Sequence, residues 1–509
     1  MDQNKIMQFL KENINLVAIA ILIFAFLIRL KYVGINSAIW WDEGEYLSMA
    51  KSLAFDTPYQ ITPVRQLVFP LLIAFLYKLG ITSLTIIKFF TVLIPSTLSV
   101  LLIYLIGKEM YSKQVGMISS FIMSVFWISL FWSARVSTDI IGLFFSLLAF
   151  YTFWRGYVKK ISPKLNLSIA GVALSLGFLT RIGNALSIVI ILLFLLITSN
   201  IKFLKNKNLY LTAVFALVCL IPYLLWNKLK FGSYFAFTTL YVDPVKDRYI
   251  TSTPFFWDFF SFFKIYLFNP WFIFFIAGLF LLYKMIIGFD LVVKNADKEL
   301  TADLFSLLTI IVPTVYFVAL LRQSTTEPRW AMVMVVGIFF LTSKALIKLY
   351  DLTKKHITEL GALALVVLIL LTGAYYQLSQ ADALIENKRD TYYPLKPAGL
   401  WMKENSSPGD IILTKAEPQT SYYTDRKIMG IAGTEAEMLP FMEKYKPKYL
   451  EITSLERYPE WIYDWPERNQ DKVRPVQVYF FDEEKTQLAV VVYEFIYKEN
   501  ESITNTSQI

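Results

Sequence analysis

Two stretches near the start of the chain decide its fold class. Residues 14–30 read Ile-Asn-Leu-Val-Ala-Ile-Ala-Ile-Leu-Ile-Phe-Ala-Phe-Leu-Ile-Arg-Leu, and after a short gap comes Trp40-Trp41-Asp42-Glu43-Gly44-Glu45-Tyr46. The first stretch is nearly long enough and apolar enough to cross a bilayer. Trp and Tyr favour the membrane–water interface because their rings are amphipathic. The acidic residues therefore lie where the chain leaves the bilayer, either as a solvated loop or as a functional site.

The composition of the whole chain is that of a membrane protein. Its 509 residues are 56% hydrophobic and 17% aromatic, and the mean hydropathy is +0.50. A soluble protein of this length could not bury so much apolar surface. Apolar runs of about 20 residues recur along the sequence, which predicts a polytopic α-helical membrane protein.

The charge and the rare residues exclude several other classes. The net charge of +9 does not indicate nucleic-acid binding, because Lys and Arg lie in short loops between apolar runs rather than in one patch. Cys219 is the only cysteine, so no intrachain disulfide can form, and His356 is the only histidine. A histidine-based metal site or a Ser-His-Asp triad is therefore not expected. The first apolar run lacks a small-residue cleavage site, so we interpret it as a retained helix.

The apolar runs predict about eleven transmembrane helices in residues 1–376. The expected spans are 14–31, 84–106, 114–132, 138–154, 167–180, 184–199, 209–226, 264–286, 304–321, 330–348 and 357–374. Residues 66–79 are also apolar, but they are short and contain Pro70, so we expect them to lie in the interface.

The positions of the charges give this topology a direction. With Lys5 and Lys11 in the cytoplasm, the loops on the same side are rich in lysine, as the positive-inside rule requires. The loops on the other side carry carboxylates and arginines instead: Asp42, Glu43, Arg65, Arg135, Asp139, Arg181, Arg322, Glu327 and Arg329. The planar fork of Arg suits bidentate contact with phosphate or carboxylate. We therefore expect an extracytoplasmic cluster, with the N-terminus cytoplasmic and everything after about Ala374 outside.

Residues 377–509 have the composition of a soluble domain. Mixed charge, Pro and Gly replace the apolar runs, and β-branched and aromatic residues predict strands at 410–414, 449–453, 476–480 and 488–493. Helical patterns lie between them, and residues 397–404 are expected to form a short helix. The sequence thus predicts a small extracytoplasmic α/β domain of about 130 residues.

Carboxylates and arginines on one face of a membrane domain suit one kind of chemistry. A carboxylate can take the proton from an acceptor hydroxyl. Arginines can hold and neutralise a phosphate leaving group. The expected reaction is displacement at a sugar carbon with a lipid phosphate leaving, and it needs no cofactor.

Short motifs in these loops resemble those of the glycosyltransferase C superfold (GT-C). More narrowly, they resemble family 39 and the aminoarabinose-transferase-like enzymes, which include protein O-mannosyltransferases. The motifs are Asp42-Glu43 with Tyr46, residues 62–65 followed by 70–72, residues 134–139, residues 179–181, and residues 327–330. Their order, spacing and shared side of the membrane carry the resemblance, which covers the membrane region. Where the family usually has Arg-Tyr, this chain has Arg329-Trp330.

The resemblance implies an inverting transfer from a dolichyl- or undecaprenyl-phosphate sugar to a protein or glycolipid acceptor in the cell envelope, without a nucleotide. It implies Asp42 as general base, with Glu43 as the alternative base or an acceptor-positioning acid. Asp139 would be a supporting acid. The candidate donor-phosphate site is then made of Arg135, Arg181 and Arg329, with Arg65 and Glu327 beside them.

Simpler interpretations remain for these residues. Glu327 and Arg329 could only pair across a turn, and Arg181 could only extend from a helix end to the interface. Arg135 and Asp139 could form an ion pair on one helix face. No metal site is expected, although Asp42 and Glu43 could hold a hard cation through their oxygens.

Three alternative functions remain for the whole chain. Trp40-Trp41-Asp42 is similar to the Trp-Trp-Asp motif of oligosaccharyltransferases, which there lies in the C-terminal soluble domain. A transporter or flippase for a lipid-linked sugar would place charges near mid-membrane and show internal repeats, and neither is visible. A non-catalytic assembly subunit would tolerate Asp42→Asn, whereas the enzyme would lose sugar transfer.

Overall fold

The computed structural model describes residues 13–238, 263–293, 297–317 and 327–497; Arg322 lies outside the described residues. By its contacts the chain divides into two units, described here separately. The first comprises Met1–Ile35, Thr62–Leu76 and Gly80–Lys388, and the second comprises Asn36–Ile61, Tyr77–Leu79 and Arg389–Ile509. The segment after the first apolar run, with Asp42 and Glu43, therefore groups with the C-terminal part of the chain.

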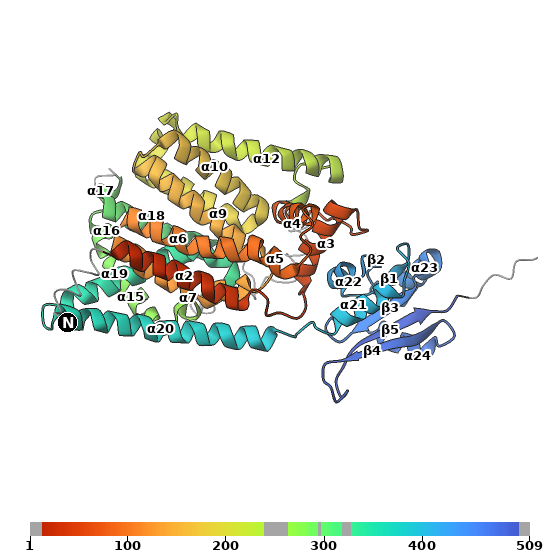
Figure 1. The fold of residues 1–509 in the computed structure, drawn as a ribbon. Helices are drawn as coiled ribbons and strands as arrows, with labels where there is room; N and C mark the ends of the chain where they lie inside the picture. Colours follow the sequence, from red (N-terminus) through yellow and green to blue (C-terminus); the bar gives the residue numbers. More distant parts are fainter. Residues whose placement is uncertain (1–12, 239–262, 294–296, 318–326, 498–509) are drawn as a thin grey trace, which may run out of the picture. The chain divides into compact units, whose positions relative to one another are not determined.

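The described part of the first unit is helical (Figure 1). Its α-helices are α2 (Ile14–Tyr32), α4 (Val68–Lys78), α5 (Leu84–Lys88), α6 (Ile94–Met110), α7 (Lys113–Val125), α8 (Trp127–Ser133), α9 (Thr138–Phe153), α10 (Pro163–Thr180), α11 (Ala185–Ser199), α12 (Leu209–Phe231), α15 (Trp271–Leu281), α16 (Tyr283–Ile287), α17 (Phe289–Val293), α18 (Lys298–Val315), α19 (Val335–Thr353) and α20 (Glu359–Lys388). Short π or 3-10 segments extend or join them: η1 (Phe89–Leu93), η2 (Trp154–Val158), η3 (Ile182–Asn184), η4 (Asn200–Lys205) and η6 (Pro328–Met334).

The helices agree with the expectation of a polytopic membrane protein. Among the described residues, eight helices are long and apolar enough to cross a bilayer, and α7 with α8 forms a ninth span if the bent pair counts as one. The other two expected spans are less regular. In the expected span 264–286 the short helices α15 and α16 begin only at Trp271. The expected span 304–321 falls in α18, which carries Lys298, Glu299 and Asp303 in its first two turns, and residues 318–321 lie outside the described residues.

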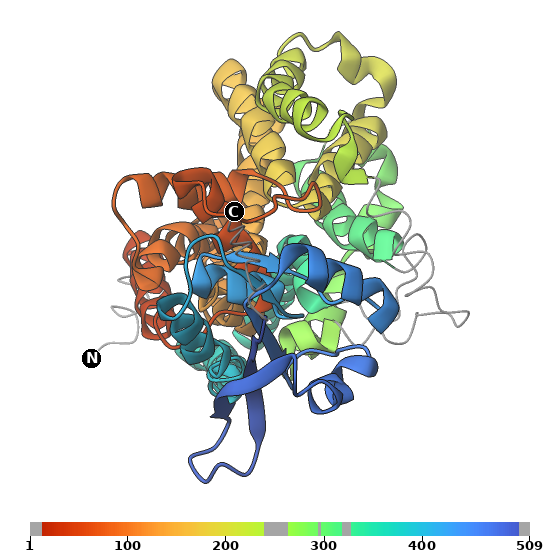
Figure 2. The same ribbon diagram turned by 90° about the vertical axis from the view of Figure 1, so that its right-hand side faces the viewer.

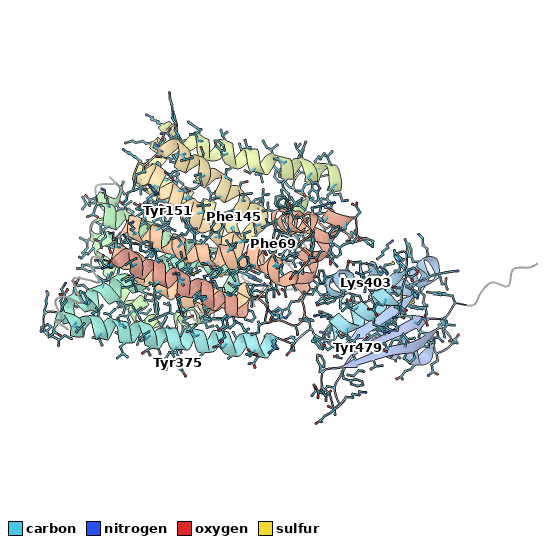
Figure 3. All side chains as sticks on the ribbon, in the orientation of Figure 1. Phe69, Phe145, Tyr151, Tyr375, Lys403 and Tyr479 are labelled. Carbon is cyan, nitrogen blue, oxygen red and sulfur yellow. The ribbon has the colours of Figure 1, made fainter. Side chains whose placement is uncertain are left out.

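Two segments differ from a simple series of spans. Within residues 66–79 only Val68–Lys78 is helical; this 11-residue helix α4, at 1.5 Å per residue, is too short to cross a hydrocarbon core of about 30 Å. Helix α20 continues beyond residue 374, where the apolar run ends, as far as Lys388. Tyr375 on this helix is 67% exposed and points away from the helices (Figure 3).

The second unit contains a five-stranded mixed sheet (Figure 2). Its strands are β1 (Ile411–Leu413), β2 (Lys427–Met429), β3 (Tyr449–Thr453), β4 (Val473–Phe480) and β5 (Leu488–Phe495), in the order β2-β1-β3-β5-β4. Strand β1 pairs in parallel with β2 and β3, and β5 pairs antiparallel with β3 and β4. Four of the strands were predicted from composition, whereas the three-residue β2 is too short to give a pattern.

Helices cover both faces of this sheet. They are α21 (Leu395–Glu404), α22 (Glu417–Thr424), α23 (Glu435–Tyr445) and α24 (Trp461–Arg468), and the unit also holds α3 (Trp41–Phe55). Successive residues of a strand point to opposite faces. Thus Ile412 packs with α21 in one buried cluster, and Leu413 packs with α23 and α24 in another. The expected α/β fold class of the C-terminal part is therefore confirmed.

Candidate active site

The first turn of α9 presents a buried carboxylate. Ser137 caps this helix: its Oγ accepts the N–H of Asp139 at 3.2 Å and donates to Asp139 Oδ2 at 2.8 Å. The positive end of the helix dipole stabilises a carboxylate at this position. The Asp139 side chain is only 2% exposed, so its charge needs partners inside the protein.

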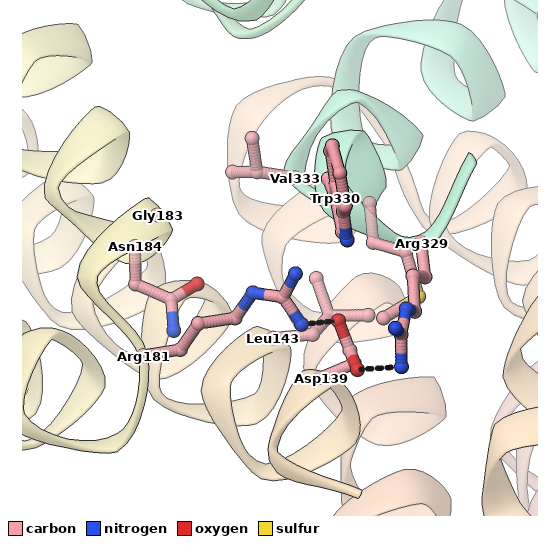
Figure 4. A pocket seen from close by; sticks show the side chains of 9 residues that line it. Asp139, Leu143, Arg181, Gly183, Asn184, Arg329, Trp330 and Val333 are labelled. Atoms are coloured by element: carbon pink, nitrogen blue, oxygen red, sulfur yellow. Dashed lines mark hydrogen bonds and ion pairs between the residues drawn. The ribbon is translucent and has the colours of Figure 1, made fainter. Parts of the chain in front are cut away.

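Two arginines from distant parts of the chain supply those partners (Figure 4). Arg181 immediately follows α10, and its Nη1 donates to Asp139 Oδ1. Arg329 lies in η6, and its Nη1 is 3.5 Å from Asp139 Oδ2. The start of α9, the end of α10 and the segment before α19 therefore meet around one carboxylate, which places three of the expected site residues together.

Arg329 has two further contacts that fix its direction. Its guanidinium lies 4.0 Å from the centre of the Trp132 ring, within range of a cation–π interaction. Its Nε is 2.6 Å from Glu327 Oε2, so the expected pairing across the turn is observed. The Glu327 side chain is 48% exposed, which limits the energy of that pair.

A small cavity lies beside this cluster. Asp139, Arg181, Asn184 and Arg329 contribute to its lining, and its accessible volume of about 20 Å³ holds roughly one water molecule. Gly142 makes room for Asn184, because a Cβ at position 142 would lie 2.3 Å from Asn184 Nδ2. Asp139 occupies guanidinium N–H groups that an entering anion would use, so an anion must compete with it.

Two more buried cations lie on or next to the loop before α9. Arg135 is 1% exposed, and its Nη2 donates to the carbonyl of Lys388, the last residue of α20, at 3.0 Å. A cation is favourable at a helix C-terminus. Lys88 is 2% exposed and donates to the carbonyl of Ala134 at 3.1 Å. Sequence reasoning missed Lys88, although a lysine inside an apolar span is itself a signal of function.

The segment after α2, expected to be a loop, forms α3. Glu43 Oε2 accepts the N–H of Trp40 at 2.9 Å, so this carboxylate caps the N-terminus of its own helix. Asp42, also in the first turn, is partly buried. Arg65 lies partly buried in the turn before α4. Asp42 and Glu43 belong to the second unit, whereas Arg65, Arg135, Asp139, Arg181, Glu327 and Arg329 belong to the first.

The simpler interpretations are partly realised. Glu327 pairs with Arg329, and Arg181 pairs with Asp139 rather than only extending from a helix end. Arg135 precedes α9, so it does not share a helix face with Asp139. Within the described ranges no group of three or more His, Cys, Asp or Glu side chains gathers as metal ligands would.

Known proteins resemble part of this chain in sequence and nearly all of it in fold. A family model described as dolichyl-phosphate-mannose-protein mannosyltransferase matches residues 63–226. No curated protein matches the sequence.

Three solved structures illustrate the shared fold. ArnT from Cupriavidus metallidurans, bound to undecaprenyl phosphate, is 13% identical with a TM-score of 0.64, over 93% of this chain and 97% of that chain. The oligosaccharyltransferase AglB from Archaeoglobus fulgidus, in complex with an inhibitory peptide and a dolichol-phosphate, is 14% identical with a TM-score of 0.60. The match covers 96% of this chain and 75% of that chain. The mycobacterial arabinofuranosyltransferase AftD is 11% identical with a TM-score of 0.55, and the match covers 96% of this chain and 40% of that chain. The chain is thus a multi-pass membrane protein with the GT-C fold.

Proposed function

We propose that this chain is an inverting membrane glycosyltransferase. It moves a sugar from a polyprenyl-phosphate donor to an acceptor hydroxyl of a protein or glycolipid on the extracytoplasmic face. The single observation that carries this proposal is the cluster in which Arg181 and Arg329 hold Asp139 at one end of the helical unit. Two guanidinium groups directed at one buried anion form the arrangement that phosphate binding requires.

The donor phosphate would bind by exchange with Asp139. Near the start of α9, cationic side chains (Lys88, Arg135, Arg181, Arg329) outnumber carboxylates (Asp139, Glu327). Such a site attracts an anion, and Asp139 keeps the arginines aligned until it arrives. In this proposal Asp139 positions the arginines and is not the base.

The transfer step needs one base and no cofactor. The acceptor oxygen attacks the anomeric carbon while the bond between that carbon and the phosphate oxygen breaks. The bonding electron pair leaves with the phosphate, where arginine stabilises the growing charge. The acceptor proton passes to the Asp42 carboxylate. Glu43 holds the turn that carries Asp42, through its bond to Trp40 N.

The donor class is supported by what solved relatives of this fold contain. The ArnT structure holds undecaprenyl phosphate, and the AglB structure holds a dolichol-phosphate. For the orientation, the lysine-rich ends of the spans support a cytoplasmic N-terminus. The start of α9 and the sheet domain would then be extracytoplasmic.

The test is a transfer assay on the full chain in lipid nanodiscs. Polyprenyl-phosphate sugars are offered with peptide and glycolipid acceptors, and products are measured by mass spectrometry. We expect Asp42→Asn to lower kcat at least about a hundredfold while retaining donor binding, because general-base catalysis contributes about 10²–10⁴-fold. Unchanged transfer by Asp42→Asn would sink the base assignment.

Glu43→Gln is the matched control for this experiment. The amide oxygen of Gln can still accept from Trp40 N, so we expect this variant to keep most of its activity, whereas Glu43→Ala loses more. If Glu43→Gln were inactive and Asp42→Asn active, Glu43 would be the base.

Movement of donor lipid across the bilayer without transfer to any acceptor would favour a flippase.

A further inference from the structure

Helix α3 packs on α22 of the sheet domain through one face. Gly44, Ser48 and Lys51 are spaced four and three residues apart, so they lie along a single side of the helix. At Gly44 the two backbones are very close: a Cβ there would lie 2.8 Å from the carbonyl carbon of Pro418 and 2.9 Å from Gln419 N. Only glycine permits this approach.

Polar bonds extend the same face. Ser48 Oγ donates to the Pro418 carbonyl at 3.1 Å. Lys51 Nζ donates to the Tyr422 carbonyl at 2.7 Å and to Asp425 Oδ1 at 2.8 Å. The Lys51 and Asp425 side chains are 19% and 21% exposed, so this ion pair is better shielded than a surface pair.

The segment before α3 is held by the same domain. The N–H of Ile39 donates to the hydroxyl of Tyr423 at 3.1 Å. Ser37 Oγ donates to Asp390 Oδ1 at 2.6 Å. The helix that carries Asp42 is therefore fastened at its entry and along its length to the C-terminal domain.

We propose that the sheet domain is part of the catalytic apparatus, because α22 positions α3 and thereby the Asp42 carboxylate. This inference rests on the proposed function and assigns the domain a role in it. At 100° per residue, Asp42 lies about 200° from Gly44 around the helix, on the side away from α22. The domain thus contacts the face of α3 that carries Gly44, Ser48 and Lys51, and Asp42 lies on the opposite face. Lys51 and Asp425 are positioning residues.

Lys51→Met tests this role, with Lys403→Met as the matched control. Lys403, on α21, also pairs with Asp425 but belongs to the sheet domain itself rather than to α3. Hydrogen exchange of residues 41–55 reports on the docking of α3, and kcat and the donor KM report on the reaction. Because small displacements of catalytic groups cost up to about 10²-fold, we expect Lys51→Met to speed exchange in α3 and to lower kcat about tenfold or more.

The donor KM should stay within about twofold, since the proposed phosphate ligands lie in the helical unit. Lys51→Arg should restore kcat, and Lys403→Met should change neither measurement. Wild-type exchange and kcat in Lys51→Met, or a raised KM with unchanged kcat, would overturn the proposal. If the wild-type chain transferred no sugar at all, the proposed function would fail, while the exchange data would still decide whether α22 holds α3.

Discussion

Asp139 shows how a single buried charge organises its surroundings. Its carboxylate takes a hydrogen bond from Ser137 and contacts Arg181 and Arg329. Removing one partner of a buried pair costs about 3–5 kcal/mol, mainly because the remaining charge is then uncompensated. The same contacts keep two guanidinium groups ordered beside the small cavity before any ligand binds.

Arg329→Lys tests whether the shape of the guanidinium matters as well as its charge. Lysine keeps the charge but cannot make a bidentate contact or lie flat over Trp132, so we expect transfer to fall about tenfold or more, with a higher donor KM. Arg155 offers a matched control, because it also lies over an aromatic ring, that of Tyr151 at 5.4 Å, at the other end of α9. Arg155→Lys should leave transfer unchanged, and equal effects of both substitutions would argue against a phosphate ligand.

At the scale of elements, the break between α7 and α8 is the feature that needs explanation. The two helices meet at 50°, and the last carbonyls of an ended helix lack partners within that helix. Arg29 of α2, fully buried, donates to Ser124 O at 2.9 Å and to Met123 O at 3.3 Å. Lipid offers no hydrogen bonds, so the Arg29 guanidinium supplies the donors that water would supply to these carbonyls in a soluble protein. Helix α8 leads directly into the loop that carries Arg135, and α9 with Asp139 follows that loop.

Arg29→Met should therefore destabilise the helical unit. The Phe126 N–H still donates to Met123 O at 3.5 Å, so the main loss falls on the Ser124 carbonyl. A carbonyl left without a donor costs about 1–3 kcal/mol, so we expect the apparent Tm in detergent to fall by several degrees. Leu27→Met on the same helix is the control, since Leu27 is 56% exposed. An unchanged Tm in Arg29→Met would mean that the break is supported by other contacts.

At the scale of the whole molecule, the sheet domain has a built-in pH dependence. Glu451 on β3 is completely buried, and burial raises its pKa from 4.5 to about 7, while a hydrogen bond from Thr420 opposes the rise. The folded state thus binds a proton between these two pH values that the unfolded state releases. The contribution of Glu451 to stability is therefore greatest below about pH 4.5 and is lost as the pH rises through about 7.

Hydrogen exchange of residues 449–453 in the full chain measures this effect. Between pH 5 and pH 8 we expect the opening free energy of wild-type β3 to fall by about 2.5 kcal/mol, at 1.36 kcal/mol per pKa unit. Glu451→Gln cannot ionise and should show no such fall. Glu494→Gln, which removes a pair with exposed Arg474, serves as the control. The same pH slope in wild type and Glu451→Gln would contradict the assignment.

Much of the fold could be predicted because hydropathy is a local property. Residues 14–30 alone indicate a membrane helix, since the transfer of apolar side chains into lipid depends little on distant residues. Strand β3 was likewise predicted within its observed bounds, Tyr449–Thr453. The short β2 and the extension of α20 to Lys388 carry no comparable local signal and were missed.

The sequence by itself determined a polytopic membrane chain with a C-terminal α/β domain and an arginine-rich set of loops. Only the tertiary structure decided which of those charges meet: Asp139 with Arg181 and Arg329, and Glu43 with its own helix end. It also decided that α3 belongs with the sheet domain. Such pairings depend on the distances between segments that are far apart in the chain. The type of a residue and its sequence neighbours do not determine those distances.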